Sequence, residues 1–169
     1  MDEVLGLQLF DAIKMRMALR KHGQKKSTLT EAKDLVRVND YEVREGLYYS
    51  EDYLWLRIED ASVRIGIIDY AQKQLHEIVY VELLSAGDTI KQNTPLGTVE
   101  SAKSVTDLVA PVSGTIEQIN EEVVDRPELI NDDPYGKGWL VIVSPTNLDE
   151  ELKRLMPDKR AVEWHKKLT

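Results

Sequence analysis

Lys103 is the residue whose setting points most directly to chemistry. It lies in the run ESAKSV at residues 100–105, between segments 94–99 and 106–111, whose residues favour extended structure. A hairpin formed by these segments places the lysine at or beside the turn, where a modifying enzyme can reach it. A free lysine amine has a pKa of about 10.4, so an exposed turn lysine is a poor base or nucleophile by itself. A chemical role for Lys103 therefore requires a group attached to its amine.

A lysine in a turn is usually only a solvated charge, but the spacing around this one is long and specific. The pattern Glu-Ser-x-Lys-x-x-x-Asp-x-x-x-Pro-x-x-Gly is made by Glu100, Ser101, Lys103, Asp107, Pro111 and Gly114. This pattern resembles the lipoylation site of the glycine cleavage system H protein family. The similarity extends over about residues 49–156, including the runs IVYVEL at 78–83 and PYGKGW at 134–139.

The resemblance implies a non-enzymatic carrier with lipoic acid attached covalently to Lys103. It implies that Glu100, Ser101 and Asp107 help define the site for a lipoate-attaching enzyme, with Pro111 and Gly114 setting the return strand. The lipoyl arm then shuttles an aminomethyl intermediate, and catalysis belongs to partner enzymes. The partners implied are a decarboxylase, an aminomethyltransferase and dihydrolipoyl dehydrogenase.

Three alternatives stay open at this stage. Biotin carriers use a similar hairpin, but their lysine normally lies between two methionines, whereas Ala102 and Ser104 flank Lys103. The family's usual His-Glu-Trp reads Tyr-Leu-Trp at 53–55, its usual Leu-Gly-Asp or Leu-Gly-Glu reads Leu-His-Glu at 75–77, and Ile68 replaces its usual Thr. These departures favour H-like lipoate-binding proteins of the heterodisulfide-reductase-like sulfur oxidation pathway, whose arm carries sulfur. An unlipoylated binding module of the same fold is the third alternative.

The elements that must position Lys103 are predicted to be mainly β-strands. Short stretches rich in Val, Ile, Leu and Tyr alternate with turn residues from about Tyr41 to Val143. The predicted strands are 54–58, 63–67, 78–83, 94–99, 115–119 and 139–143. The expected fold class, by resemblance, is a barrel-sandwich hybrid of the lipoyl and biotinyl carrier type, built from two small antiparallel sheets.

Helices are predicted at three places around these strands. Residues 69–76 read as a short internal helix, and a C-terminal helix follows Pro145, with Leu148, Leu152, Leu155 and Met156 at helical spacing. Residues 2–22 suit an amphipathic helix that ends at Gly23. The predicted division is an N-terminal helical extension and linker at 1–40 and a lipoyl-carrier domain at 41–169. Mixed charge on residues 2–22 favours packing on the domain or a partner over membrane binding.

Composition excludes several classes of function. The net charge of −8 repels a phosphate backbone, so nucleic acid is not expected as a partner. Cysteine is absent, which excludes disulfides, thiolate metal sites and thiol nucleophiles. No apolar run is long enough to span a bilayer, and no secretory signal pattern is present, so we expect no membrane association and a cytoplasmic protein.

The remaining clusters favour ordinary structural roles. His22, His76 and His165 are far apart in sequence and make no metal-ligand pair. The acidic residues at 121, 122, 125, 132 and 133 are expected to be solvated charges beside turns. Gly136-Lys137-Gly138 lacks phosphate-loop spacing and is predicted to form a tight turn before Trp139.

Overall fold

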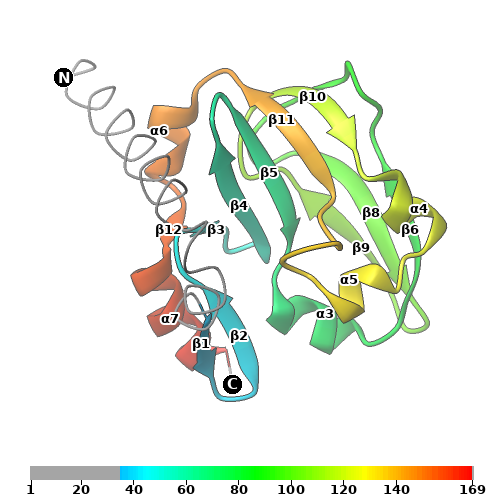
Figure 1. The fold of residues 1–169 in the computed structure, drawn as a ribbon, viewed down its shortest axis with the longest axis vertical. Coiled ribbons are helices and arrows are strands. Elements are labelled where there is room, and N and C mark those ends of the chain that lie inside the picture. Colours follow the sequence, from blue (N-terminus) through cyan, green and yellow to red (C-terminus); the bar gives the residue numbers. More distant parts are fainter. Residues whose placement is uncertain (1–34, 169) are drawn as a thin grey trace, which may run out of the picture.

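The computed structural model describes residues 35–168, which form three antiparallel sheets and five helices (Figure 1). A seven-stranded sheet has the order β12 (Met156–Pro157), β3 (Tyr48–Tyr49), β4 (Leu54–Glu59), β5 (Ser62–Ile67), β11 (Val141–Pro145), β10 (Gly114–Ile119), β7 (Thr89–Ile90). A three-stranded sheet has the order β6 (Ile78–Leu83), β8 (Pro95–Ser101), β9 (Val105–Val109). The third sheet is the hairpin of β1 (Leu35–Val38) and β2 (Tyr41–Arg44).

The helices are short and lie at the edges of the sheets. They are α3 (Asp69–Leu75), α4 (Glu121–Asp125), α5 (Leu129–Asp132), α6 (Leu148–Leu152) and α7 (Asp158–Lys167). The mainly β class is confirmed, as are the six predicted strands and the short internal helix, each within about two residues at its ends. Among the described residues, no helix combines the length and the apolar character that crossing a bilayer requires.

Two clusters of buried side chains hold these elements together. The larger one lies between the seven-stranded and three-stranded sheets, with Ile65, Val99 and Ile116 each at most 1% exposed. Buried residues alternate with more exposed ones along the first half of β10 and along β11, as one buried face of a strand requires, whereas β4 is buried over most of its length. This core fixes the three-stranded sheet from which the Lys103 hairpin projects.

The second cluster joins α7 and the β1–β2 hairpin to the seven-stranded sheet. Trp55 is fully buried there, and its indole N–H donates to the carbonyl of Pro134 at 3.0 Å. Tyr49 donates to the carbonyl of Arg44 at 2.6 Å, and Tyr135 donates to that of Glu42 at 2.6 Å. The two tyrosines therefore tie the hairpin to the body through its backbone.

Glycine is required beside Trp55 because the indole occupies the space of a side chain. A Cβ on Gly66 would lie 2.4 Å from a ring carbon of Trp55, closer than non-bonded atoms approach. The pairing of Trp55 with Gly66 across β4 and β5 places the ring directly over the glycine. The buried tryptophan and the small residue therefore specify one another.

The C-terminal segment differs from the single helix predicted. Helix α6 ends at Leu152, Met156 belongs to the two-residue strand β12 that pairs with β3, and α7 follows. Pro157 explains the interruption, because proline disfavours helical geometry in the residue before it and suits the start of a helix after it. Met156 is consequently extended, although its spacing from Leu152 is helical.

Three further predictions concern segments outside the predicted strands. The β-structure begins at Leu35, earlier than the Tyr41 expected. Asn39 adopts a positive φ of 56° and forms the turn that joins β1 to β2, so a further strand precedes Tyr41. The acidic residues 121, 122 and 125 lie in α4, and residue 132 lies in α5, whereas loops were expected. The predicted helix at residues 2–22 lies outside the described residues.

Candidate modification site

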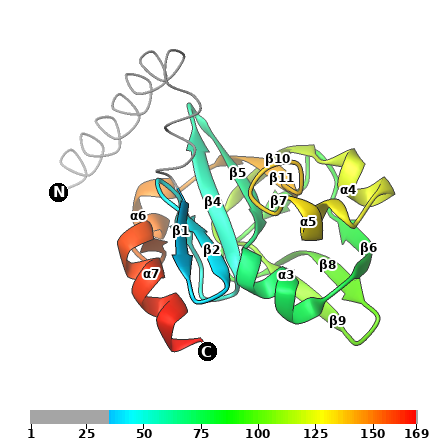
Figure 2. The ribbon, with the colours of Figure 1, turned by 60° about the horizontal axis from the view of Figure 1, so that its bottom comes forward.

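Lys103 is exposed to solvent at the end of the β8–β9 hairpin. The strands pair through Glu100 and Val105, and the backbone N–H of Ser101 donates to the carbonyl of Ser104 at 2.9 Å. Residues 102–104 therefore form a short loop, which Figure 2 shows at the outer edge of the molecule. The sequence prediction of a lysine at or beside a hairpin turn agrees with this placement.

Ser101 holds the loop from inside. Its side chain is buried, at 5% exposed, and its hydroxyl oxygen accepts the backbone N–H of Lys103 at 3.3 Å. Together with the bond to Ser104, this fixes the backbone on both sides of the lysine. The hydroxyl consequently contacts the loop's own backbone rather than an approaching enzyme.

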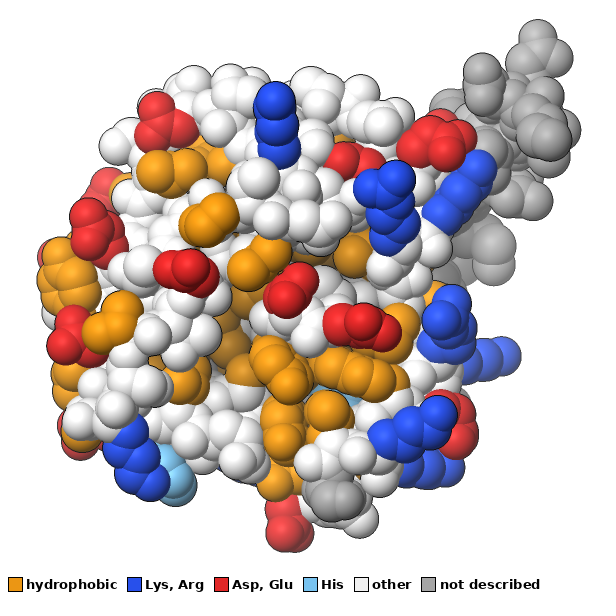
Figure 3. Space-filling model, turned by 180° about the vertical axis from the view of Figure 1, so that it is seen from behind, with side chains coloured by type: hydrophobic (Ala, Val, Ile, Leu, Met, Phe, Trp, Pro, Cys, Tyr) orange, Lys and Arg blue, Asp and Glu red, His pale blue; other side chains and the backbone are white. Residues whose placement is uncertain are grey.

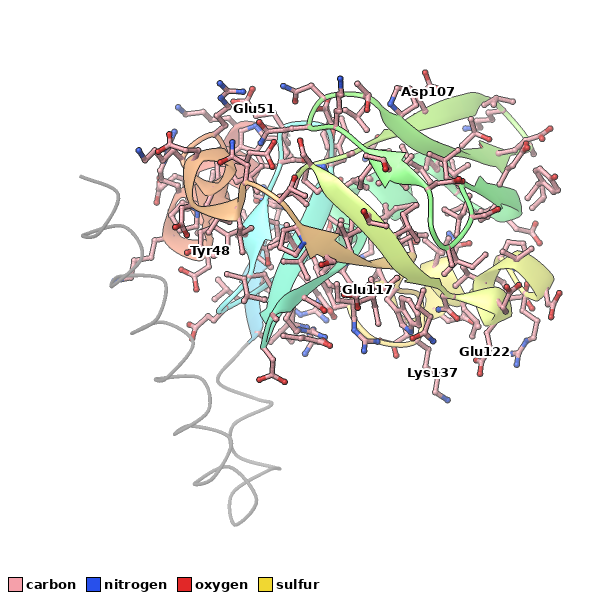
Figure 4. The ribbon with its side chains drawn as sticks, turned by 90° about the horizontal axis from the view of Figure 1, so that it is seen from above. Tyr48, Glu51, Asp107, Glu117, Glu122 and Lys137 are labelled. Carbon is pink, nitrogen blue, oxygen red and sulfur yellow. The ribbon has the colours of Figure 1, made fainter. Side chains whose placement is uncertain are left out.

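Glu100 and Asp107 lie on the outer face of the three-stranded sheet. Glu100 is half-buried and stands between Tyr80 on β6 and Val105 on β9 in the strand register. Asp107 is exposed and lies one row further along, opposite Thr98, and its side chain points away from the body in Figure 4. Directly paired residues share one face of a sheet, so both carboxylates face the same side.

Exposed apolar side chains adjoin these carboxylates, and they were not predicted. Val79, Tyr80 and Val105 are 50%, 51% and 65% exposed. The register between β6 and β8 shifts between Ile78 and Tyr80, so two consecutive residues, Val79 and Tyr80, both reach solvent. Such bulges break the alternation from which exposure is predicted, and they re-aim side chains near functional sites. The end of the hairpin thus combines a lysine, apolar side chains and carboxylates.

Pro111 and Gly114 lie beyond the return strand, because β9 ends at Val109 and Gly114 opens β10. A Cβ on Gly114 would lie 2.2 Å from the carbonyl oxygen of Ser144, so the glycine permits close pairing with β11. The two residues therefore lead the chain from one sheet into the other. The expectation that they set the return strand is corrected to this connecting role.

A strained turn lies beside the hairpin end. His76 ends α3 with φ 62° and ψ −144°, a region that L residues rarely adopt and glycine adopts freely. Asn131 fixes this turn by donating to the carbonyl of His76 at 2.6 Å and accepting from the N–H of Ile78 at 3.0 Å. Ile78 then pairs with Ser101, so the turn at 76–77 adjoins the loop that carries Lys103.

The residues that depart from the family pattern near position 54 are mostly internal. Leu54 and Ile68 are 2% and 0% exposed, so they pack in the cores. Tyr53 is 40% exposed, and its ring lies 5.8 Å from that of Tyr70 and 5.7 Å from that of Trp164. On the face of the molecule that Figure 3 shows, hydrophobic side chains, coloured orange, gather below the centre of the view. The surface near residue 53 is therefore aromatic.

The other candidate residues stand apart from the hairpin. His165 is fully buried in α7, where burial lowers its pKa, and His22 lies outside the described residues. Residues 136–138 form a turn before Trp139, as predicted. Within residues 35–168, no three His, Asp or Glu side chains gather in a way that could hold a metal ion.

Comparison with known proteins identifies the family. The family model described as "Glycine cleavage H-protein" matches residues 47–168. The chain belongs to the glycine cleavage H-protein family. Relatives include a probable glycine cleavage system H protein of Pyrococcus abyssi, 47% identical over 135 residues that cover 79% of this chain and 100% of the relative. The glycine cleavage system H protein of Geobacillus kaustophilus is 47% identical over 104 residues, covering 62% and 82% respectively.

A solved H-protein structure supports the fold assignment. The glycine cleavage system H protein from Mycobacterium marinum superposes with a TM-score of 0.67 at 35% identity, covering 72% of this chain and 98% of that one. The fold is thus the barrel-sandwich hybrid expected from the family resemblance. The family model begins at Leu47, after the β1–β2 hairpin, whereas the longer match to the Pyrococcus abyssi relative reaches back into that hairpin.

Proposed function

We propose that this H-family chain carries lipoic acid on Lys103 and moves an aminomethyl intermediate between the enzymes of glycine cleavage. The observation that carries the proposal is an exposed lysine on a short, hydrogen-bonded hairpin loop of an H-protein fold. Amide formation removes the lysine charge and leaves a flexible tether that ends in two sulfurs. The protein itself supplies presentation, and the partner enzymes supply catalysis.

The attachment site divides into residues that shape the loop and residues that an enzyme can contact. Ser101 belongs to the first group, because its buried hydroxyl accepts the N–H of Lys103. Glu100 and Asp107 belong to the second, with Tyr80 and Val105 beside them on the outer face. We assign this face to the lipoate-attaching enzyme, which must contact the hairpin end to modify it.

Glycine cleavage supplies the remaining partners. The proposed partners are the decarboxylase that loads the arm, the aminomethyltransferase that unloads it and dihydrolipoyl dehydrogenase, which reoxidises it, all in the cytoplasm. The sulfur-carrier alternative has no support among the matched relatives, whose names refer to glycine cleavage. The burial of Leu54 and Ile68 also weakens that alternative, because buried side chains do not line a surface site for the arm.

Intact mass measurement of the full chain tests the attachment. Protein purified from lipoate-replete cells that contain its lipoate-attaching enzyme is expected to carry one lipoyl group, located on Lys103 by peptide mapping. The Lys103→Arg variant keeps the charge but cannot form the amide product, so its mass is expected to stay unmodified. Lys91→Arg, at another exposed lysine, is the matched control and is expected to be lipoylated normally.

The same measurement separates the carrier from an unlipoylated binding module. A wild-type protein that stays uniformly unmodified under these conditions excludes the carrier function. Lipoylation at a lysine other than Lys103 overturns the site assignment while leaving a carrier function in place.

A further inference from the structure

A groove of about 420 Å³ lies between the β1–β2 hairpin and α7. Val36 and Val43 line it from the hairpin, and Val162 lines it from α7. Five charged residues form the rest of the lining: Arg44, Glu45, Asp158, Lys159 and Glu163. An apolar floor with a charged rim suits an amphipathic segment, whose apolar side chains enter while its polar face stays in water.

The two walls of this groove differ in their relation to the family model. Helix α7 lies inside the matched residues 47–168, whereas β1 and β2 precede them. The match to the Pyrococcus abyssi relative, however, spans 135 residues, more than the 123 in residues 47–169, so it reaches back into this hairpin. The groove therefore belongs to the part of the chain that this relative shares, and the segment before the hairpin lies outside that match. The β1–β2 hairpin and α7, which form its walls, lie on the opposite flank of the molecule from the β8–β9 hairpin (Figures 1 and 2).

The chain before β1 has the composition to fill this groove. Residues 4–19 contain nine large apolar residues with no interior proline: Val4, Leu5, Leu7, Leu9, Phe10, Ile13, Met15, Met17 and Leu19. Between Leu19 and Leu35 lie 15 residues, enough for a tether of up to about 50 Å when extended. Since Val36 itself lines the groove, the tether begins at the groove wall.

Charge also favours contact between this segment and the body. Residues 1–34 contain seven Lys or Arg and five Asp or Glu, a net charge of +2. Because the whole chain carries −8, residues 35–169 carry −10. Six of the seven basic residues lie between positions 14 and 26, where acidic residues are absent. The groove rim itself offers three carboxylates against two basic side chains.

We propose that residues 4–19 of this chain dock into the groove between the β1–β2 hairpin and α7 of the same molecule. The apolar side chains of the segment contact Val36, Val43 and Val162, and its basic end lies near the carboxylates of the rim. Asp158 and Glu163 keep their present partners, the N–H of Gly46 and the amine of Lys166, at the edge of the groove. A short tether gives an effective concentration in the millimolar range, so even weak contacts favour the docked form.

Paired cysteines in the full chain test this docking, because the natural chain has none. Leu9→Cys with Val162→Cys places one thiol in the segment and one in the groove. The control pairs Leu9→Cys with Lys137→Cys, since Lys137 is exposed and lies away from α7 in Figure 4. Under mild oxidation, we expect an intramolecular disulfide to form at least about tenfold faster in the groove pair than in the control pair.

Two outcomes overturn the proposal. Equal rates in the two pairs mean that the segment does not favour the groove. Disulfide-linked dimers in place of monomers mean that the segment docks on a second copy of the chain. The mass of the non-reduced protein distinguishes these products directly.

Hydrogen exchange supplies a second measurement that needs no cysteine. Amides of residues 4–19 are expected to exchange more slowly in the full chain than in its Val162→Asp variant, which places a charge in the groove. Thermal unfolding of both proteins checks that the variant still folds. Full exchange of residues 4–19 at unprotected rates in the wild-type chain excludes the docking.

Discussion

At the scale of single residues, the hairpin end combines an exposed lysine side chain with a hydrogen-bonded loop backbone. The side chain of Lys103 is exposed to solvent, while the loop backbone beneath it is fixed by the hydroxyl of Ser101 and the carbonyl of Ser104. A carrier benefits from this division, because an enzyme meets the attachment point in one defined geometry. The attached arm can still reach several active sites.

His76 has the least favourable backbone conformation near this loop, and the cost is measurable. With φ 62° and ψ −144°, a Cβ is strained, at a typical cost of about 1–3 kcal/mol. His76→Gly removes the strain but adds entropy to the unfolded chain, so we expect a net gain of about 1 kcal/mol in the free energy of unfolding. Urea denaturation of the two proteins measures this difference.

Alanine provides the matched control for His76. His76→Ala removes the imidazole yet keeps the Cβ, so the backbone strain stays and no comparable stabilisation is expected. If the alanine variant gains as much as the glycine variant, the imidazole rather than the backbone is the source of the cost.

The site was predictable where a residue acts through its own chemistry and spacing. The position of Lys103 followed from two short extended segments around a polar turn. The exposure of Val79 and Tyr80 did not, because it depends on a register shift between β6 and β8 that no local pattern encodes. The burial of Ser101 depends on the same pairing, since its strand partner is the buried Ile78.

At the scale of elements, strands were more predictable than the C-terminal helices. Residues 78–83 were predicted correctly as β6 because five of the six are Ile, Val, Tyr or Leu, types that favour strands. The apolar spacing of Leu148, Leu152 and Met156 suggested one helix, but pairing with Tyr49 makes Met156 part of a strand. Strand β1 was missed because its four residues are too few for a clear periodic signal, whereas β2 begins at Tyr41, where the predicted β region began.

Helix α7 depends on a buried histidine, which makes its packing sensitive to pH. The Nδ1–H of His165 donates to the carbonyl of Ala161 at 2.7 Å, and its Nε2 is buried without a partner. The rings of Tyr49 and Trp164 contact the imidazole edge-on. Burial lowers the pKa of His165, while the bond to Ala161 and the charge of Asp69 act in the opposite direction.

Acidification is therefore expected to destabilise the fold through His165. Because its pKa in the folded protein is below the ordinary value of about 6.5, the unfolded chain binds the proton more readily below that pH. The free energy of unfolding should fall as pH drops below about 6.5, at no more than about 1.4 kcal/mol per pH unit for one proton. Urea denaturation between pH 7.5 and pH 5 is the measurement.

His165→Leu isolates this contribution from that of the carboxylates. The variant lacks the titrating group, so its stability should depend less steeply on pH in the same window. Identical pH dependence in the two proteins means that protonation of His165 does not determine the acid response.

At the scale of the whole molecule, the chain presents one reactive position on a rigid β body. The core between the sheets fixes the β8–β9 hairpin, and the second core joins α7 and the β1–β2 hairpin on another flank. The barrel-sandwich architecture was predicted from the resemblance to the H-protein family, which rests on the motif at residues 100–114 and on the similarity over about residues 49–156. The resemblance did not give the β1–β2 hairpin, which precedes the family model at residue 47, although the match to the Pyrococcus abyssi relative reaches back into it.

The pathway that the arm serves can be decided by exchange of glycine carboxyl carbon with bicarbonate. With glycine decarboxylase present, the lipoylated chain is expected to accelerate this exchange, because loading of the aminomethyl group onto the arm releases the carboxyl carbon reversibly. Lys103→Arg should reduce the rate to that of decarboxylase alone, and Lys91→Arg should leave it unchanged. A chain that is fully lipoylated on Lys103 but gives no exchange above decarboxylase alone is not an aminomethyl carrier for that enzyme. Since attachment is established by mass and loading by exchange, the carrier function and its pathway can fail separately.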